Sequence, residues 1–466
     1  MIFLDKKVQD GKLHEECGVF GINSFSGHNV AEKVYYGLYA LQHRGQESAG
    51  IASNAGGEIT LKKDMGLVND VFKAADLESL QGDIAIGHVR YATFGEPNAV
   101  NAQPLVGRSR LGQLSVAHNG TLVNAGILRE LLEDSGAIFQ TTIDSEVILN
   151  LMVRSGKKEV EQCLKETLNV IKGAFALTMT IGEYLIGIRD PYGIRPLILG
   201  KTDDNYILAS ESSALDVLEA TIVRDIEPGE MVFIKGDEVK SIKYSEKTQH
   251  RVCSFEYIYF ARPDSIMDGI SIHEARLRLG EKLFKEHPVE ADIVIGVPDS
   301  GIAAALGYAR ASTIPFDIGF TKNKYIGRTF IAPSQEIRDK NVNIKLNAIR
   351  NVVNGKRVVL IDDSIVRGTT SRKLIETLRF AGAKEIHFRV SSPKVMHPCY
   401  FGIDTPDRRD LIAATKSVEE IRSEIGADSL GFISEQGLVE ALDHNNGYCT
   451  GCFSGIYPMS IPQDEN

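Results

Sequence analysis

The sequence predicts an α+β unit in its first half and an α/β unit in its second half. Short apolar runs broken by Gly and Asn dominate the first half, which indicates helices layered on an antiparallel sheet. After about residue 250, strands and helices alternate, as in right-handed βαβ units on a parallel sheet. A chain of 466 residues also exceeds what a single core usually supports, roughly 250–300 residues.

In the first half, apolar residues alternate or run continuously between turn residues, which predicts strands within 57–66, 82–93, 112–120, 173–190 and 205–210. Apolar residues recur at helical spacing between these runs, which predicts helices within 31–45 and 144–156. The polar segment 238–252 is the best candidate for a linker or a strap.

In the second half, residues 291–312 follow the order strand, tight loop and helix, and residues 356–390 follow the order strand, loop, helix and strand. The strands IVIGV and VVLI are continuously apolar, which is typical of parallel strands covered on both faces. Ligands bind at the carboxyl ends of such strands in open α/β sheets.

Composition excludes several functional classes. The net charge of −10 disfavours non-specific binding to nucleic acid or to an anionic membrane, and no segment approaches the roughly 20 apolar residues of a membrane helix. The N-terminal stretch has an apolar run of only three residues, Ile2 to Leu4, between Met1 and Asp5, which is too short for a secretory signal. We therefore expect a cytoplasmic protein, in which six cysteines suggest thiol chemistry or metal ligation rather than disulfides.

The strongest local signal is IDDSIVRGTTS, residues 361–371. A strand delivers Asp362 and Asp363 to its carboxyl end, and residues 364–370 form a small-residue loop that opens a helix. Free backbone N–H groups and the hydroxyls of that loop make an anion site. Paired carboxylates beside a phosphate suit sugar hydroxyls, Mg²⁺ or a developing ribosyl cation, so the stretch points to a phosphoribosyl group. The alternative is an ordinary helix N-terminus with acids in its first turn.

This stretch resembles the signature of type I phosphoribosyltransferases, and its form DDSIVRGTT is similar to that of glutamine phosphoribosylpyrophosphate amidotransferases. GVPDSG (296–301) and YIGRTFIAPSQ (325–335) extend the match. The resemblance implies that Ser300, Asp362 and Asp363 surround Mg²⁺. It also implies that 5-phosphoribosyl-1-diphosphate is bound by both aspartates and by the loop residues Ser364, Val366, Arg367, Gly368, Thr369 and Thr370.

The same resemblance implies that residues 325–345 form a lid, with Arg328 and Lys345 reaching the diphosphate. Such a lid would exclude water from a reactive ribosyl cation. The alternative is an ordinary charged surface loop. Asn343 stands where the family often has Arg, so one contact to the diphosphate is in question.

The stretch HEECGVFGI places Cys17 before a short strand. Structural burial is the local alternative, because free cysteine behaves as a small apolar residue. CGVFGI, however, resembles the mature N-terminus of class II glutamine amidotransferases, which are N-terminal-nucleophile hydrolases with an αββα fold. An α-amine with a pKa of roughly 7.7–8.0 can serve as the base for its own thiol, whose pKa is roughly 8.5. Residues 1–16 are therefore expected to be a propeptide that is removed.

Further motifs follow Cys17 in the order of that family. The resemblance implies that Arg90 binds the α-carboxylate of glutamine, that Asp144 binds its α-ammonium group, and that Asn119 with the Gly120 N–H forms the oxyanion hole. Taken singly, these motifs could be a surface ion pair, a helix N-cap and a turn. LQHRGQESAGI (41–51) also fits the family pattern, but we derive no role from it.

The remaining cysteines divide into two groups. Cys449 and Cys452 form a C-x-x-C, and with Cys253 and Cys399 they could hold zinc or a [4Fe–4S] cluster, or remain redox-active thiols. Their positions resemble the cluster-bearing branch of the amidotransferases, which implies the iron–sulfur cluster. Cys163 shares a helical face with Leu164 and Leu168, so we expect it in the core.

Together these resemblances imply a glutaminase domain at 17–245 and a type I phosphoribosyltransferase domain at 253–466. The implied reaction transfers ammonia from glutamine to 5-phosphoribosyl-1-diphosphate, which is the entry to purine synthesis. Purine nucleotide inhibitors and a homotetramer are implied as well. The main alternative is a nucleotide-sensing regulator that has a phosphoribosyltransferase-like fold without turnover, and a nearer one is an amidotransferase that feeds ammonia to a sugar phosphate.

Overall fold

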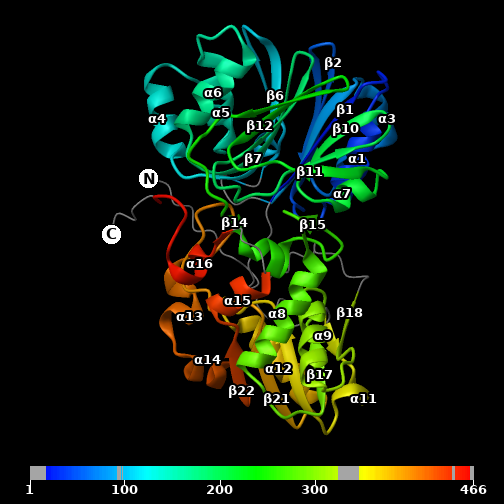
Figure 1. The fold of residues 1–466 in the computed structure, drawn as a ribbon, viewed down its shortest axis with the longest axis vertical. Coiled ribbons are helices and arrows are strands. Elements are labelled where there is room, and N and C mark those ends of the chain that lie inside the picture. The colour runs from blue at the N-terminus through cyan, green and yellow to red at the C-terminus, as the bar shows by residue number, and fades with distance from the viewer. Residues whose placement is uncertain (1–16, 92–95, 97, 324–345, 443–446, 462–466) are drawn as a thin grey trace.

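The computed structural model describes residues 17–91, 96, 98–323, 346–442 and 447–461. Two lobes lie end to end along the longest axis of the molecule (Figure 1). The expected propeptide, residues 1–16, lies outside the described residues, and so do the lid residues Arg328, Asn343 and Lys345.

The first lobe is built on two antiparallel sheets. One has seven strands in the order β11-β9-β10-β1-β4-β2-β3 and the other has six in the order β13-β12-β8-β7-β6-β5. The seven-stranded sheet comprises β1 (Gly18–Ser24), β2 (Ser48–Ala55), β3 (Glu58–Met65), β4 (Ile84–Arg90), β9 (Ile198–Lys201), β10 (Asn205–Ala209) and β11 (Thr221–Asp225). The six-stranded sheet comprises β5 (Leu105–Ser109), β6 (Gly112–Leu122), β7 (Gly173–Ile181), β8 (Tyr184–Arg189), β12 (Glu230–Lys235) and β13 (Glu238–Lys243).

Helices cover the outer face of each sheet. Those on the seven-stranded sheet are α1 (Ala31–Ala40), α2 (Val68–Val71), α3 (Ala74–Ser79) and α7 (Ser213–Asp216), and those on the other sheet are α4 (Ala125–Asp134), α5 (Ser145–Arg154) and α6 (Val160–Val170). A separate apolar core that includes Val19, Ile86 and Ala176 fills the space between the sheets. The predicted αββα arrangement is therefore confirmed. Cys163 belongs to α6 and is fully buried in the core that this helix covers, as expected.

The second lobe contains a parallel sheet in the order β17-β20-β21-β22, as the alternation of strands and helices predicted. Its strands are β17 (Ile293–Gly296), β20 (Arg357–Asp362), β21 (Glu385–Val390) and β22 (Ser429–Phe432). The principal helices are α8 (Ile272–Glu286), α9 (Gly301–Ser312), α12 (Thr369–Phe380), α14 (Val418–Ile425) and α15 (Glu435–Leu442), with the shorter α11 (Arg350–Val353), α13 (Ile412–Thr415) and α16 (Gly451–Ser454). Apolar cores on both sides of the sheet explain why its strands are continuously hydrophobic.

Short strand pairs complete this lobe. β15 (Ile266–Met267) pairs with β16 (Ile270–Ser271), and β18 (Phe320–Lys322) pairs with β19 (Leu346–Ala348). β14 (Val252–Cys253) pairs in parallel with β23 (Tyr448–Cys449), so the C-terminal part of the described chain returns to the junction between the lobes. Among the described helices, none combines the length and the apolar composition that crossing a membrane requires.

The linker prediction was partly wrong. Residues 238–243 of the proposed linker form β13, which joins β12 in a hairpin and lies at the edge of the six-stranded sheet. An edge strand has a face in contact with water and is often charged, which explains the polar composition. Val239 and Ile242 nevertheless pack against the cores of the lobe.

Candidate functional site

Cys17 immediately precedes β1, at the end of the strand that lies beside β4. The register pairs Gly18 with Val89, so the nucleophile candidate lies next to Arg90. The Cys17 Sγ atom is 3.6 Å from the carbonyl oxygen of Tyr91. The residue is only 9% exposed, so the structure places the thiol in a protected position at the end of the sheet.

Charged groups surround the Cys17 thiol. Burial raises its pKa, while the hydrogen bond to the Tyr91 carbonyl and the positive charge of Arg90 act in the opposite direction. The carboxylates of Asp144 and Glu47 raise the pKa further. Cys17, Arg90 and Asp144, predicted from three separate motifs, are therefore brought together by the fold.

Asp144 occupies the N-cap position of α5, yet its side chain makes no capping hydrogen bond. Its Oδ2 atom instead accepts a hydrogen bond of 2.9 Å from the backbone N–H of Leu122 on β6. Burial opposes ionisation, but neighbouring His118 and the hydrogen bonds outweigh it and hold the pKa of Asp144 below its ordinary value. The helix-cap alternative therefore does not explain this residue, and a buried carboxylate is available to a cationic ligand.

Asn119 lies on β6 and is fully buried. Within the described part of the chain, neither Oδ1 nor Nδ2 of its amide has a hydrogen-bond partner. Buried amides are normally satisfied, so an orphaned one at this position indicates a ligand contact. Gly120 follows with φ of 131°, and a Cβ atom there would lie 2.1 Å from the carbonyl oxygen of Ala174. Only glycine fits this close approach of two strands.

Arg44, from the motif to which no role was assigned, contacts the nucleophile directly. Its Nε atom donates a hydrogen bond of 3.2 Å to the carbonyl oxygen of Cys17. Its two terminal nitrogens pair with Glu256 at 2.7 and 2.9 Å, and Nη1 also contacts Glu211 at 2.6 Å. Sequence alone could not reveal this contact, because Glu256 belongs to the part of the chain that follows the first lobe.

The second predicted site lies at the carboxyl ends of the parallel strands. β20 ends at Asp362, and Asp363 follows directly; both are almost fully buried. The Ser300 hydroxyl, from the loop after β17, donates a hydrogen bond of 2.5 Å to Asp363 Oδ2. The Ser364 hydroxyl donates one of 2.7 Å to Asp363 Oδ1. Ser300 and Asp363, predicted from two separate motifs, therefore meet.

The loop after these aspartates leads into α12. Gly368 has φ of 77° at the N-cap position, a conformation that favours glycine, and Thr369 and Thr370 are the first two residues of the helix. The first N–H groups of a helix have no partner within the helix, and helix N-termini of this kind commonly bind anions. The structure therefore places residues 364–370 at the N-terminus of a helix, the position that the sequence predicted for them.

The four cysteines Cys253, Cys399, Cys449 and Cys452 gather at the junction of the lobes. Cys253 and Cys449 are directly paired in β14 and β23. Burial, followed by the charges of Cys399 and Cys253, raises the pKa of Cys452 well above its ordinary value. Among the described residues, no three His, Cys, Asp or Glu side chains are placed to hold a single metal ion.

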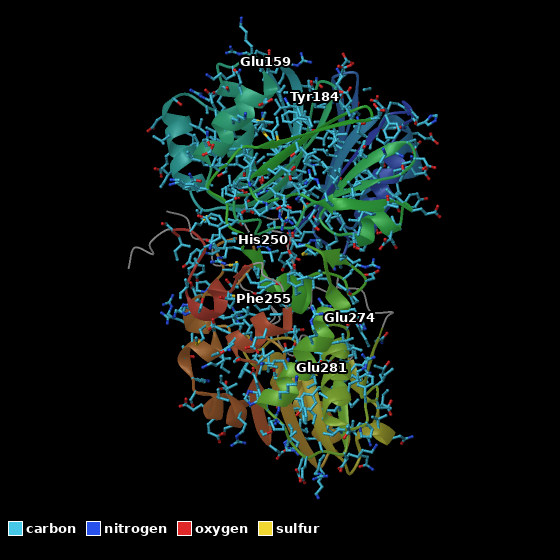
Figure 2. The ribbon with its side chains drawn as sticks, viewed as in Figure 1. Glu159, Tyr184, His250, Phe255, Glu274 and Glu281 are labelled. Atoms are coloured by element: carbon cyan, nitrogen blue, oxygen red, sulfur yellow. The ribbon has the colours of Figure 1, made fainter. Side chains whose placement is uncertain are left out.

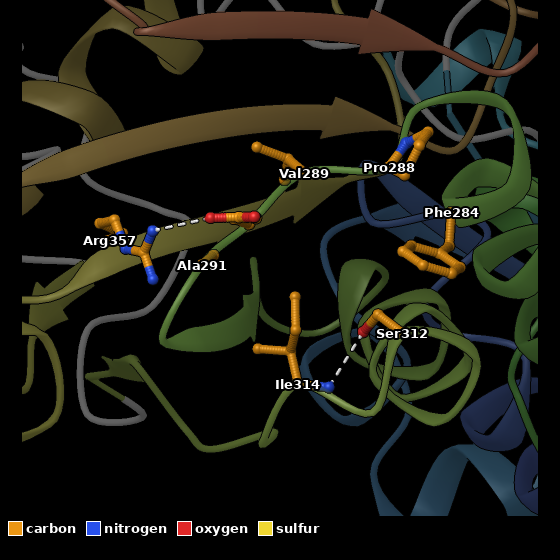
Figure 3. A pocket seen from close by; sticks show the side chains of 8 residues that line it. Phe284, Pro288, Val289, Ala291, Ser312, Ile314 and Arg357 are labelled. Carbon is orange, nitrogen blue, oxygen red and sulfur yellow. Dashed lines mark hydrogen bonds and ion pairs between the residues drawn. The ribbon is translucent and has the colours of Figure 1, made fainter.

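A cavity of about 570 Å³ lies elsewhere in the second lobe (Figure 3). Phe284, Ala291, Ile314 and Arg357 are among its lining residues. Arg357 begins β20 whereas Asp362 ends it. The cavity therefore lies at the amino end of this strand, and the predicted phosphate site lies at its carboxyl end.

Comparison with known proteins agrees with this two-site arrangement. A family model described as a glutamine amidotransferase domain matches residues 88–217, and one described as a phosphoribosyl transferase domain matches residues 268–396. The amidophosphoribosyltransferase of Bacillus subtilis strain 168 is 52% identical over 460 residues, which are 97% of this chain and 96% of the relative. This chain belongs to the amidophosphoribosyltransferase family.

Other members of the family show the same correspondence. The amidophosphoribosyltransferase of Methanocaldococcus jannaschii is 48% identical over 462 residues, covering 96% of this chain and 98% of that protein. A solved structure of the B. subtilis glutamine phosphoribosylpyrophosphate amidotransferase, complexed with ADP and GMP, superposes with a TM-score of 0.91 at 50% identity. It covers 96% of this chain, so the likeness to an amidophosphoribosyltransferase extends over both lobes.

Proposed function

We propose that the chain hydrolyses glutamine at Cys17 and transfers the ammonia to 5-phosphoribosyl-1-diphosphate. The products are 5-phosphoribosylamine, glutamate and diphosphate, and the reaction is the first step of de novo purine synthesis. One observation carries the proposal: a single chain of this family assembles a thiol site with Arg90 and Asp144 and a carboxylate site at Asp362 and Asp363. We assign the first activity to residues 17–245 and the second to residues 253–466.

The Cys17 thiol is the proposed nucleophile. Removal of residues 1–16 would free the α-amine, which takes the proton from Sγ as the sulfur attacks the side-chain amide of glutamine. Sγ forms a thioester, and the amine returns the proton to the departing ammonia; water then releases glutamate. The burial of Cys17 supports the need for an adjacent base, because burial alone raises the pKa of the thiol.

Three further roles follow from the geometry. The guanidinium of Arg90, beside Cys17, suits the α-carboxylate of glutamine, and the buried carboxylate of Asp144 suits its α-ammonium group. The unpartnered amide of Asn119 supports its assignment to the oxyanion hole, with the backbone N–H of Gly120 as the second donor. These donors would stabilise the charge that develops on the amide oxygen.

At the second site, residues 364–370 would bind the 5′-phosphate, with backbone donors and the hydroxyls of Thr369 and Thr370. The pair Asp362 and Asp363 would accept hydrogen bonds from the ribose hydroxyls and stabilise positive charge at C1 as diphosphate leaves. Ammonia then attacks C1. The assigned roles of Arg328 and Lys345 at the diphosphate rest on the sequence, because both residues lie outside the described part of the chain.

Asp362, Asp363 and Ser300 fit Mg²⁺. This cation usually keeps several waters and binds through one or two carboxylates together with substrate phosphates. Such a site needs no cage of three protein carboxylates, so it agrees with the lack of a closed metal cage among the described residues. When bound, Mg²⁺ would neutralise charge on the diphosphate.

Cys253, Cys399, Cys449 and Cys452 fit a [4Fe–4S] cluster better than a single zinc ion. Four thiolates can ligate either group, and the positions of these cysteines in the sequence resemble the cluster-bearing branch of the family. Three of these thiols, Cys253, Cys449 and Cys452, are buried, and burial raises the pKa of each, so a metal centre would be needed to hold them as thiolates. A cluster there would hold the C-terminal segment against the junction, a structural or oxygen-sensing role, and its presence would place the chain in the propeptide-bearing branch.

Purine nucleotides are the proposed feedback inhibitors, and a homotetramer is the proposed assembly. The ADP and GMP complex of the B. subtilis relative supports the first proposal. Isothermal titration with each nucleotide and light scattering of the purified protein would test the two proposals separately.

The proposed reaction is tested by mixing the cleaved, cluster-loaded protein with glutamine, 5-phosphoribosyl-1-diphosphate and Mg²⁺. Stoichiometric release of glutamate and diphosphate is expected. A regulator without turnover would bind the ribosyl diphosphate and release neither product. Mass spectrometry of the same preparation should find Cys17 at the N-terminus.

A further inference from the structure

Arg44 joins the nucleophile to a carboxylate of the other unit. The guanidinium holds the Cys17 carbonyl through Nε at 3.2 Å and grips Glu256 with both terminal nitrogens, at 2.7 and 2.9 Å. Arg44 and Glu256 are 1% and 0% exposed, so water does not compete for either of them. A bidentate pair of this kind fixes direction as well as distance.

Glu256 is itself firmly placed. It begins a π-helical turn, Glu256–Phe260, and follows the β14 residue Cys253 closely. Phe255, its neighbour, lies at the end of the second lobe that is nearer to the first lobe (Figure 2). π-Helical turns are rare and occur frequently at functional sites.

Two arginines hold this turn in place. Arg276 on α8 donates to the carbonyl oxygens of Tyr257, Tyr259 and Ala261 at 2.8–2.9 Å. Arg195 lies 3.5 Å from Glu256 Oε1 and donates to the carbonyl oxygen of Phe401, close to Cys399. The position of the Glu256 carboxylate is therefore set by segments that carry two of the four gathered cysteines.

The charges show why Glu256 matters to Cys17. Arg44 also donates to Glu211 through Nη1 at 2.6 Å, whereas Nη2, the other terminal nitrogen of the guanidinium, donates to Glu256 at 2.7 Å. Without the Glu256 charge, the guanidinium can rotate toward Glu211 and carry its Nε donor away from the Cys17 carbonyl. The α-amine and the thiol belong to the same residue as that carbonyl, so their orientation changes with it.

We propose that Glu256 is a positioning residue for the nucleophile: its carboxylate fixes Arg44, and Arg44 fixes the backbone of Cys17. The inference rests on the proposed function, and it adds a route by which the cysteine-bearing junction controls glutamine hydrolysis. Glu256 touches neither substrate in this account.

The test compares Glu256→Gln with Asp268→Asn. Asp268 also makes a buried bidentate pair across the lobes, with Arg189 at 2.8 Å for both bonds. In the described part of the chain it makes no hydrogen bond or ion pair with Arg44 or Cys17. For Glu256→Gln we expect kcat for glutamine-driven diphosphate release to fall roughly 10- to 100-fold, with little change in KM for glutamine, because misplacement of a reacting group costs about this much. Ammonia-driven release and iron content should stay close to wild type, and Asp268→Asn should retain both activities.

Two further measurements separate positioning from general damage. Alkylation of Cys17 by iodoacetamide, followed by peptide mass spectrometry across pH, should be slower in Glu256→Gln than in Asp268→Asn. Glu256→Asp keeps the charge on a shorter side chain and should have an intermediate glutamine-driven rate, which tests the inference even where Glu256→Gln does not fold. An equal loss of glutamine- and ammonia-driven activity, or unchanged Cys17 alkylation, would overturn the inference. A wild-type protein that releases no diphosphate would instead overturn the proposed function.

Discussion

The Ser300 hydroxyl donates a 2.5 Å hydrogen bond to Asp363 and so ties the loop after β17 to the loop after β20. These strands are parallel neighbours, with Gly296 opposite Ile361, so their carboxyl ends deliver both loops to one place. The contact orients Asp363 toward the proposed binding site for 5-phosphoribosyl-1-diphosphate.

Replacing Asp363 with Asn is therefore expected to lower diphosphate release by about 100-fold or more with either glutamine or ammonia, because charge that stabilises the transition state is lost. Steady-state kinetics with both nitrogen sources provides the measurement. Asp292→Asn removes an exposed carboxylate of the same lobe and serves as the control. Normal turnover by Asp363→Asn would remove this residue from the site.

Asn119→Ala tests the oxyanion hole. Removing one such donor lowers kcat by about 10²–10³-fold in related chemistry, whereas binding of glutamine through Arg90 and Asp144 should persist. Glutaminase kinetics should show the loss in kcat, and the rate of iodoacetamide alkylation at Cys17 should not change. A large rise in KM with kcat preserved would show that Asn119 binds the ground state instead.

His88 predicts a specific sensitivity to acid. It is fully buried on β4, its Nε2 donates to the His118 carbonyl at 3.0 Å, and burial lowers its pKa from 6.5 to about 3. Between these values the unfolded chain binds the proton and the folded chain does not, so stability falls as pH falls. At pH 5 this group alone should cost about 2 kcal/mol relative to neutral pH.

The check on His88 is the melting temperature at pH 7.5 and pH 5 of the wild type and of His88→Gln. Gln keeps a donor for the His118 carbonyl but does not titrate, so the variant should lose less stability on acidification. Identical losses in the two proteins would show that His88 is not the responsible group.

Cys452→Ser should abolish binding of iron and destabilise the junction. Cys163→Ser changes a buried cysteine in the core of the first lobe, and this variant should bind iron as the wild type does. Iron analysis and visible absorption of protein prepared without air measure the difference directly. Wild-type protein that is colourless and free of iron after such a preparation would contradict the cluster assignment.

Much of the second site could be predicted because its signal is local. Asp362, Asp363 and the 364–370 loop are contiguous, and a parallel strand followed by a helix leaves one place for them. Prediction of the nucleophile required evidence from other parts of the sequence, because the residues around Cys17 alone do not distinguish a reactive thiol from a thiol that is buried for structural reasons. The ordered presence of Arg90, Asn119 and Asp144 favoured catalysis, and the fold brings Arg90 and Asp144 to the thiol.

The contacts that were missed are those with no local pattern. Arg44 and Glu256 are 212 positions apart, and no sequence pattern around either residue indicates that they form an ion pair. The composition of residues 238–243 predicts a linker and not the edge strand β13, because the polar residues of this segment outnumber its apolar residues, Val239 and Ile242. Long-range ion pairs and edge strands depend on the assembled fold, which spacing and composition do not encode.

The central claim is that ammonia made at Cys17 is used at the ribosyl site of the same chain. Cys17→Ala prepared as the chain that begins at residue 17 tests it most directly, with diphosphate release measured first with glutamine and then with ammonium chloride. The account predicts no glutamine-driven release and near-normal ammonia-driven release. Glutamine-driven release at the wild-type rate would contradict it.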